Sequence, residues 1–516
     1  MSTLPTDPIL SCEASLAYEK KFFGGDEELE WQAMNKAGEG VGDALLRDMR
    51  ELRTIPHRPR LLTLVGKGHN GGDALIATKR FLRTIPTARA VILPLVSWED
   101  CRPLVQRAWK ELTELAEKRI ELIETSADFL QELEKKTGDR GFDALIDGLL
   151  GMQAKLPLRD PLPSILKWVN DSEKIAVKAS VDLPTGITEN GIEHPLRADF
   201  TYCTGIVKEL VTDSENADFV GRLRYLDLNF FTNDRIENQS KRVLQSNALS
   251  TLRKLRCVEG DKRTHGHLFL LAGSRNFGGA AMMAAKAALK AGVGLLTVGI
   301  PESLHAAFVS QLPEAMWVPL PETPDGAIAL EGLGKVRQFL GRATALVAGP
   351  GIGEEKETHA LIREVCSLFE GPTLLDADAL RSEILNKLTN LDNLVLTPHA
   401  GEFNRLANGD SPSDWIAGKA CTVVLKGAHT QVLTNRERLY CLGGSTVLAR
   451  GGSGDLLAGI IGALLAKNKY SNQDAACLGV QWHGRAGEVL ARQHGQESVM
   501  TTEILDYLSF ALRNEF

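Results

Sequence analysis

The chain has 516 residues, a formal net charge of -7, 43% hydrophobic and 24% charged residues, and 48 glycines. Its length exceeds what one hydrophobic core normally organises, so more than one domain is expected, and its acidic balance gives no basic surface for nucleic acid or an anionic membrane. The sequence holds no run of about 20 apolar residues that would span a membrane, and its eight cysteines lack metal-binding spacing. These properties predict a cytoplasmic α/β protein whose cysteines are buried thiols.

The first half alternates short apolar runs with amphipathic stretches, a pattern typical of buried parallel strands joined by helices. We expect strands at residues 61–65, 90–95, 144–147 and 175–181, and helices at residues 74–83 and 102–118. This order predicts a doubly wound, Rossmann-like domain. Residues 229–250 are polar and charged, so the boundary is placed near residue 245, giving domains of residues 1–245 and 246–516.

The second half shows the same alternation and predicts a second α/β domain. Strands are expected at residues 267–272, 295–300, 343–348, 373–376, 394–397 and 422–426. An Ala-rich helix is expected over residues 279–291 and has side chains small enough for close packing on a sheet. Residues 431–442 alternate around a turn at Asn435, which indicates an antiparallel hairpin at the edge of this sheet.

A glycine-rich loop follows the first expected strand and reads Gly66-Lys67-Gly68-His69-Asn70-Gly71-Gly72-Asp73. The string matches G-x-G-x-x-G, but a dinucleotide fingerprint also needs an acidic residue at the end of the second strand. That strand ends in Leu93-Pro94-Leu95-Val96-Ser97 instead. We therefore interpret the loop as an oxyanion or phosphate site and not as an ordinary NAD site.

Polar residues follow two further strands of the first half, with Asp147 after one and Asp182 and Thr185 after the next. Because the carboxyl ends of parallel strands meet in one crevice, these residues and Asn70 are expected to converge. Their oxygen atoms suit a hard cation, although each aspartate alone is also a common turn residue.

The order of these motifs resembles the NAD(P)H-hydrate epimerase domain, whose members interconvert the R and S epimers of hydrated NADH or NADPH. The matching segments are Met34 to Gly38, His69 to Asp73, Asp147, Asp182 to Gly186 and Thr204 to Lys208. The resemblance implies a hydrate site formed by His69, Asn70, Gly71, Gly72, Asp73, Gly151, Met152, Gln153, Ala154, Lys155, Leu156, Pro157 and Asp182. It further implies that Asn70, Asp147 and Thr185 hold a potassium ion and that Asp182 is the catalytic acid or base.

The chain departs from that family at three places. His69 stands where the family commonly has Asn, Thr185 where it has Ser, and Gly151-Met152-Gln153 where it has a Gly-Thr-Gly-like turn. His69 keeps a hydrogen-bond donor and Thr185 keeps a hydroxyl. The altered loop leaves open a second interpretation, a nucleotide-binding protein with an inactive N-terminal site.

The second half contains the loop Gly451-Gly452-Ser453-Gly454, which places Asp455 at the start of an apolar helix. Glycine allows backbone angles at which successive N–H groups converge on an anion at the positive end of the helix dipole. Asp455 then lies where a substrate hydroxyl meets a transferring phosphoryl group. The sequence has no G-x-x-x-x-G-K-[ST] string, so a P-loop mechanism is excluded.

The ordered motifs from residues 262–266 to 451–455 resemble the ADP-dependent NAD(P)H-hydrate dehydratases of the ribokinase-like superfamily. The resemblance implies that Asp455 activates the hydroxyl of the S hydrate, and that loss of phosphate from the phosphorylated hydrate restores NAD(P)H. It implies hydrate contacts at Ala280, Gly353, His399 and Asp455. It implies ADP contacts at Lys426, Gly427, Ala428, His429, Thr430 and Gly454, with Mg²⁺ as a further cofactor.

Together the two halves predict a bifunctional enzyme that repairs NADH hydrate and NADPH hydrate with ADP as co-substrate, and we expect it to form a homo-oligomer. A small-molecule kinase of the same superfamily is the alternative, since it would retain Asp455 and the glycine loop. The N-terminal motifs and the segment from Thr397 to Glu402 argue against that alternative.

Overall fold

The computed structural model describes residues 2–123, 129–232, 236, 239–256, 258–388 and 391–513. The chain forms two compact units, one of residues Asp7–Ser246 and one of Asn247–Phe516 together with Met1–Thr6. None of the helices in these ranges combines the length and the apolar character of a membrane span. Five residues of the polar segment expected at the boundary, 233–235 and 237–238, lie outside the described residues, as does Cys257. The other seven cysteines are free and buried, as predicted.

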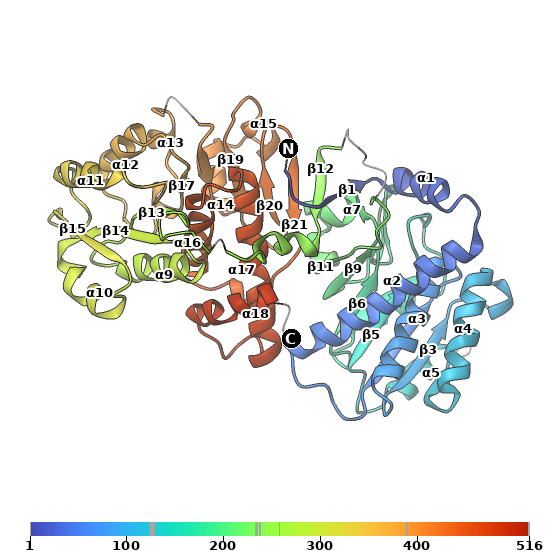
Figure 1. The fold of residues 1–516 in the computed structure, drawn as a ribbon. Coiled ribbons are helices and arrows are strands. Elements are labelled where there is room, and N and C mark those ends of the chain that lie inside the picture. Colours follow the sequence, from blue (N-terminus) through green and yellow to red (C-terminus); the bar gives the residue numbers. More distant parts are fainter. Residues whose placement is uncertain are drawn as a thin grey trace. The chain divides into compact units, whose positions relative to one another are not determined.

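The unit of residues Asp7–Ser246 is built on a seven-stranded parallel sheet (Figure 1). Its strands lie in the order β11 (Arg222–Leu226), β9 (Phe200–Thr204), β6 (Lys178–Val181), β5 (Ala144–Gly148), β2 (Arg60–Val65), β3 (Arg89–Pro94) and β4 (Ile120–Leu122). The chain runs outward from β2 to β3 and β4 and then returns to the other side of β2 as β5. The point where the strand order reverses therefore lies between β2 and β5.

Helices cover both faces of this sheet. On one face α2 (Glu27–Asp48), α3 (His69–Thr84) and α4 (Pro103–Ala116) share a core with the sheet, and on the other α5 (Phe129–Thr137) and α6 (Leu162–Asp171) do so. Helix α1 (Cys12–Phe23) packs separately, through Tyr18 against Phe230 and Phe231. The remaining elements are β1 (Thr6–Leu10), which pairs in parallel with β10 (Val207–Lys208), the neighbouring β12 (Lys241–Leu244), the hairpin β7 (Ile187–Thr188) and β8 (Gly191–Ile192), and the short helices α7 (Glu209–Thr212) and α8 (Ala217–Val220).

The second unit contains nine strands in the order β21 (Arg438–Cys441), β20 (Thr430–Leu433), β19 (Thr422–Leu425), β18 (Leu394–Leu396), β17 (Thr373–Leu375), β16 (Ala345–Ala348), β13 (His267–Leu271), β14 (Leu295–Pro301) and β15 (Met316–Leu320). The strands from β15 to β19 are parallel, and β20 and β21 continue the sheet as an antiparallel hairpin. Here the strand order reverses between β13 and β16, because the chain runs out to β15 before it returns.

Two long apolar helices of this unit pack closely together (Figure 1). A Cβ on Gly459 of α16 (Ser453–Ala466) would lie 2.2 Å from the Ala284 carbonyl oxygen of α9 (Gly278–Lys290), so only glycine permits this contact. The other helices are α10 (His305–Gln311), α11 (Leu333–Leu340), α12 (Lys356–Leu368), α13 (Ser382–Leu385), α14 (Ala400–Ala407), α15 (Pro412–Ile416), α17 (Asn472–His494) and α18 (Leu508–Arg513).

The first residues of the chain belong to the second unit. The hydroxyls of Ser2 and Thr3 donate to the two carboxylate oxygens of Asp474, over 2.5 and 2.7 Å. Asp474 lies in the first turn of α17 and is 1% exposed, so this attachment is largely shielded from water.

The α/β class and the doubly wound sheet predicted from the sequence are confirmed, and every expected strand is present with ends shifted by a few residues. Two expected boundaries were wrong. Helix α3 begins at His69 and not at Ala74, because the residues after Gly68 already form its first turn. Strand β6 begins at Lys178, since the apolar residue Ile175 makes only an isolated bridge to Phe142.

Candidate active sites

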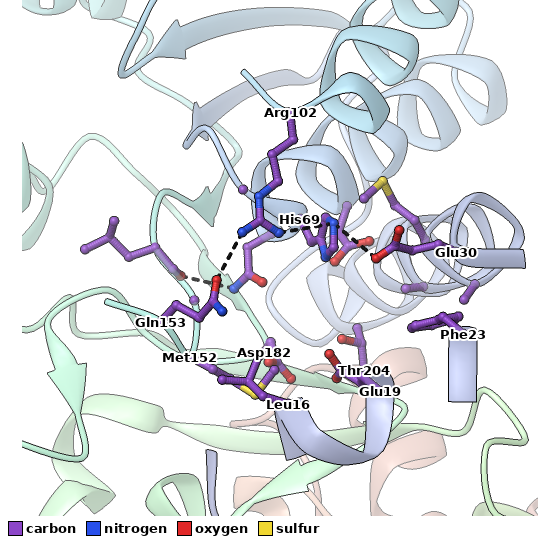
Figure 2. Close-up of a pocket in the computed structure, with 18 of the residues that line it drawn as sticks. Leu16, Glu19, Phe23, Glu30, His69, Arg102, Met152, Gln153, Asp182 and Thr204 are labelled. Carbon is purple, nitrogen blue, oxygen red and sulfur yellow. Dashed lines mark hydrogen bonds and ion pairs between the residues drawn. The ribbon is translucent and has the colours of Figure 1, made fainter. Parts of the chain in front are cut away.

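A cavity of about 530 Å³ opens in the first unit at the carboxyl ends of β2, β5, β6 and β9 (Figure 2). It lies where the strand order reverses, the usual place for a ligand in an open α/β sheet. Of the expected hydrate-site residues, those that line it are His69, Asn70, Asp73, Gly151, Met152, Gln153, Ala154 and Asp182. Those that do not line it are Gly71, Gly72, Lys155, Leu156 and Pro157.

Gly71 and Gly72 instead allow close packing beneath the cavity. A Cβ at Gly71 would lie 2.1 Å from the Gly66 carbonyl oxygen, and one at Gly72 would lie 2.6 Å from the sulfur of Met34. The glycines therefore let α3 approach the strand-end loop and helix α2.

Asp182 is held in an ion pair at the floor of the cavity. The Lys208 ammonium donates to Asp182 Oδ1 over 2.6 Å, and the two side chains are 1% and 5% exposed. Burial works against the Lys208 charge, but the charges of Asp182 and Glu19 outweigh it and raise the pKa of Lys208. Asp182 also has a φ of 68°, a left-handed conformation that is rare outside glycine and often found at functional sites.

Lys208 had no role of its own in the sequence-based predictions, although a signal was present. Lys208 directly follows the apolar residues Ile206 and Val207, and a lysine that ends a buried strand requires a partner.

Two further carboxyl groups line the same cavity. Asp73 is 7% exposed, and its side chain has no hydrogen-bond or ion-pair partner among the described residues. Burial, reinforced by the charge of Asp182, raises the pKa of Asp73 well above its usual range. Burial likewise raises the pKa of Glu19 on α1, which the sequence did not single out. Asp73 thus favours its protonated form more strongly than a solvent-exposed aspartate does, and it lies close to the lysine-paired Asp182.

The expected potassium ligands lie at one edge of this site. The carboxylate of Asp147 accepts hydrogen bonds from the Thr185 hydroxyl at 2.8 Å, the Thr185 amide at 2.9 Å, the Ser180 hydroxyl at 3.1 Å and the Leu149 amide at 3.2 Å. Burial raises the pKa of Asp147, while these hydrogen bonds oppose the shift. Asn70 donates its amide hydrogens to two backbone carbonyls, those of Leu150 and Val181.

A polar rim borders the cavity away from this floor (Figure 2). Arg102 donates to Gln153 Oε1 over 3.0 Å and lies 3.4 Å from His69 Nε2, which in turn lies 3.5 Å from Glu30. Burial lowers the pKa of His69, with Glu30 opposing and Arg102 reinforcing the shift. The sequence alone did not point to Arg102 or Glu30, because each contacts residues that are distant from it in the chain.

The second unit brings polar residues to the carboxyl ends of four neighbouring parallel strands. Gly349 follows β16, Asp376 follows β17, Thr397 follows β18 and Lys426 follows β19. The Lys426 ammonium donates to Asp376 Oδ1 over 2.9 Å, and the Thr397 hydroxyl donates to the same oxygen over 2.7 Å. Asp376 was not assigned a role from the sequence, yet it anchors Lys426.

Asp455 lies beside this ion pair in the first turn of α16. Burial, together with the charges of Asp376 and Asp378, raises its pKa to about 7, although Lys426 opposes the shift. A Cβ on Gly454 would lie 3.4 Å from the Lys426 ammonium, so the glycine loop and the lysine are in contact range. Asp455, Gly454 and Lys426 are thus brought together as expected.

The loop before α16 presents free donors. Gly452 has a φ of 87°, and no side chain caps the helix. Within the described ranges, the backbone amides of Gly454 and Asp455 donate to no acceptor. Unsatisfied amides at the start of a 14-residue helix form an anion site.

The other expected residues of this unit occupy neighbouring loops. The Gly353 amide donates to Asp378 over 3.0 Å, and Ala280 contacts the same loop at Gly351. His399 caps α14 by accepting from the Gly401 amide over 3.0 Å, and Glu402 completes this capping box. Residues Gly427, Ala428 and His429 lie in the turn between β19 and β20, and Thr430 is the first residue of β20.

Two family models match the chain. Residues 31–210 match the YjeF-related protein N-terminus, and residues 268–509 match NAD(P)H-hydrate dehydratase. A solved structure of an ADP/ATP-dependent NAD(P)H-hydrate dehydratase from Bacillus subtilis is 25% identical, covers 52% of this chain and 97% of its own, and has a TM-score of 0.45.

Two relatives match across both halves. A bifunctional NAD(P)H-hydrate repair enzyme of Gloeobacter violaceus is 36% identical over 380 residues, which cover 69% of this chain and 72% of that protein. The enzyme of the same name from Thermosynechococcus vestitus is 32% identical over 499 residues, 92% of each chain. The chain therefore belongs to the family of bifunctional NAD(P)H-hydrate repair enzymes.

Proposed function

We propose that this chain repairs hydrated NADH and NADPH in two steps. Residues 1–245 interconvert the R and S hydrates, and residues 246–516 use ADP to convert the S hydrate into NAD(P)H, AMP and phosphate. The observation that carries the second step is the position of Asp455, whose pKa of about 7 and adjacent free amides suit a base beside a phosphoryl group.

In the dehydratase step, Asp455 takes the proton of the C6 hydroxyl of the hydrate. The oxygen of that hydroxyl attacks the terminal phosphorus of ADP, and AMP leaves. The amides of Gly454 and Asp455 and the ammonium of Lys426 stabilise the negative charge that develops on the phosphoryl group. The C6–O bond then breaks with loss of a proton from C5, which restores the C5–C6 double bond and releases phosphate. His399, Gly353 and Ala280 are proposed to position the hydrate, and residues 427–430 the nucleotide.

Magnesium is proposed to arrive with ADP. Asp376 accepts from Lys426 and Thr397 through Oδ1, and Glu402 caps α14 through Oε2, so each of these two carboxylates has one oxygen engaged. A small dication that retains water and is held mainly by substrate phosphates fits these surroundings. When bound, it would neutralise phosphate charge.

In the epimerase step, Asp73 is proposed to protonate the C6 hydroxyl, which leaves as water while the ring nitrogen supplies its electron pair. Water returns to either face of C6, and the released proton returns to Asp73. Asp182, ion-paired with Lys208, is the carboxylate that stabilises the cationic ring.

At the edge of the first site, the oxygen atoms of Asn70, Asp147 and Thr185 are of the kind that a potassium ion takes. Gly151 leaves space beside the Asn70 carboxamide oxygen, because a Cβ there would lie 2.9 Å from it. Such an ion would supply positive charge next to the Asp147 carboxylate.

The test uses a mixture of R and S NADH hydrate with ADP, magnesium and potassium, followed by absorbance of the dihydronicotinamide. Full recovery of absorbance is expected, and recovery that stops at the S fraction would mean an inactive first site. Asp455→Asn should abolish recovery but leave R–S interconversion, measured by chromatography, intact. The exposed Asp410→Asn serves as a matched control. No recovery with ADP or ATP would favour a small-molecule kinase.

A further inference from the structure

The rim of the first cavity is formed by residues that are distant in the sequence but joined by contacts (Figure 2). Arg102 at the start of α4 reaches Gln153, from the loop after β5, and His69, from the first turn of α3. His69 and Gln153 are also two positions at which this chain departs from the family pattern. Two of the three departures therefore meet at a single arginine.

Arg102 has an uncompensated charge. It lines the cavity, and none of the described residues places a carboxylate within ion-pair distance of its guanidinium. Its two side-chain contacts leave other N–H groups of the planar fork available. Lys67 and Lys20 also line the cavity, whereas Glu30 adds a carboxylate to the rim beside His69.

The floor of the cavity offers a phosphate less. Its lysine, Lys208, is engaged by Asp182, and Asp73 and Glu19 place two further carboxyl groups beside that pair. A phosphate meets no unpaired cation among these four side chains, whereas the uncharged hydrated ring needs none. A dinucleotide hydrate entering ring first thus leaves its phosphates toward the rim.

We propose that Arg102 binds a phosphate group of the dinucleotide hydrate and, held by Gln153 and His69, sets the affinity of the first site for its substrate. This inference rests on the proposed epimerase function. The phosphate is either the pyrophosphate, which both hydrates carry, or the 2′-phosphate, which only NADPH hydrate carries. Arginine suits either because its fork forms two charge-assisted hydrogen bonds with phosphate oxygens.

The experiment compares Arg102→Ala and Arg102→Lys with the wild-type full chain. R–S interconversion of NADH hydrate and of NADPH hydrate is followed by chromatography without ADP. We expect Arg102→Ala to raise KM about tenfold with little change in kcat, since one charge-assisted contact of the bound substrate is lost. The KM of Arg102→Lys should lie between those of the wild type and Arg102→Ala, because lysine keeps the charge but lacks the planar guanidinium fork.

Lys110→Ala is the matched control, since Lys110 is an exposed cation on the same helix and does not line the cavity. It should leave both KM values unchanged. A rise in KM for both hydrates in Arg102→Ala assigns the contact to the pyrophosphate. A rise in KM for NADPH hydrate alone assigns it to the 2′-phosphate. Unchanged KM values for both hydrates, or an equal rise in Lys110→Ala, would overturn the proposal.

Calorimetric titration of NADPH hydrate separates this inference from the proposed function. If the wild-type chain does not interconvert the epimers but Arg102→Ala still weakens one binding site about tenfold, the phosphate contact stands and the epimerase assignment fails. If both activity and binding are unaffected by the substitution, the phosphate contact fails.

Discussion

Asp182 is a buried carboxylate and Asp455 a half-buried one, and the two have different electrostatic partners. Lys208 contacts Asp182 directly at 2.6 Å, whereas Lys426 donates to Asp376 and leaves Asp455 beside further carboxylates. One aspartate is thus ion-paired with a lysine, while the other changes protonation close to neutral pH. The two proposed reactions should accordingly respond differently to pH and to substitution.

The pKa of Asp455 predicts the pH dependence of the dehydratase. The pKa is raised to about 7, so the carboxyl is protonated below that pH and ionised above it. As a base it must be ionised, and kcat/KM should therefore fall about tenfold per pH unit below pH 7 and level off above it. Initial rates with S hydrate and ADP from about pH 5.5 to about pH 8.5 measure this. A profile that is flat through pH 7 would exclude Asp455 as the base.

The ion pair in the first cavity predicts a separable effect on stability and activity. Asp182→Asn leaves Lys208 buried and unpaired, which should lower the free energy of unfolding of this unit by roughly 3–5 kcal/mol and abolish R–S interconversion. Asp182→Asn combined with Lys208→Met should regain most of the stability but none of the activity. Urea unfolding and chromatography measure the two quantities. A stable single variant would contradict the pairing, and an active double variant would contradict the catalytic role.

Close packing of α9 against α16 positions the glycine loop in the second unit. Helix α16 begins at Ser453 and carries Asp455 in its first turn, while Gly459 one turn later touches the backbone of α9. Because the contact involves a main-chain oxygen, it fixes the depth and rotation of α16. The direction of the free amides is therefore set by a contact outside the site.

Gly459→Ala should destabilise the second unit by about 1–3 kcal/mol, since the Ala284 carbonyl oxygen cannot rotate away from the added methyl group. The same substitution at Gly334 in α11, where no atom lies within 4 Å of the new Cβ, should stabilise by up to about 1 kcal/mol through helix propensity. Thermal and urea unfolding compare the two variants. Equal effects would show that the close approach of the helices is unimportant.

Elements built from contiguous apolar runs could be predicted from the sequence. Strands β2, β5 and β16 are buried along most of their length, so their sequences are nearly continuous apolar runs, the pattern typical of buried parallel strands. The pairing of β1 with β10 could not be predicted, since it joins Ile9 to Val207 and depends on the folded unit. Nor could Arg102 be placed at the rim, because its contacts to His69 and Gln153 depend on where helix α4 begins.

At the scale of the whole molecule, each of the two units has its own sheet and its own candidate site. The first site lies where the strand order of its sheet reverses, and the second lies at the carboxyl ends of β16, β17, β18 and β19. The first holds an aspartate–lysine pair below the rim that carries Arg102, and the second holds a glycine loop beside a lysine.

Ligand binding should therefore stabilise the units separately. ADP at about 100 times its Kd should stabilise the unit of residues Asn247–Phe516 by about 2.7 kcal/mol and leave the unfolding of residues Asp7–Ser246 unchanged. Scanning calorimetry of the full chain with and without ADP measures both transitions, and Lys426→Ala should lose the shift. An equal shift of both transitions would show that the units unfold together.

The attachment of Ser2 and Thr3 to Asp474 has a consequence for the order of synthesis. Ser2 and its partner are 472 residues apart, so the leading segment is made well before the carboxylate that receives it. At about 5–20 residues per second the interval is roughly 20–90 s, during which residues 7–246 can fold as a unit. Residues 7–246 can thus fold before Ser2 and Thr3 can bind Asp474, and that contact is among the last to form in the second unit.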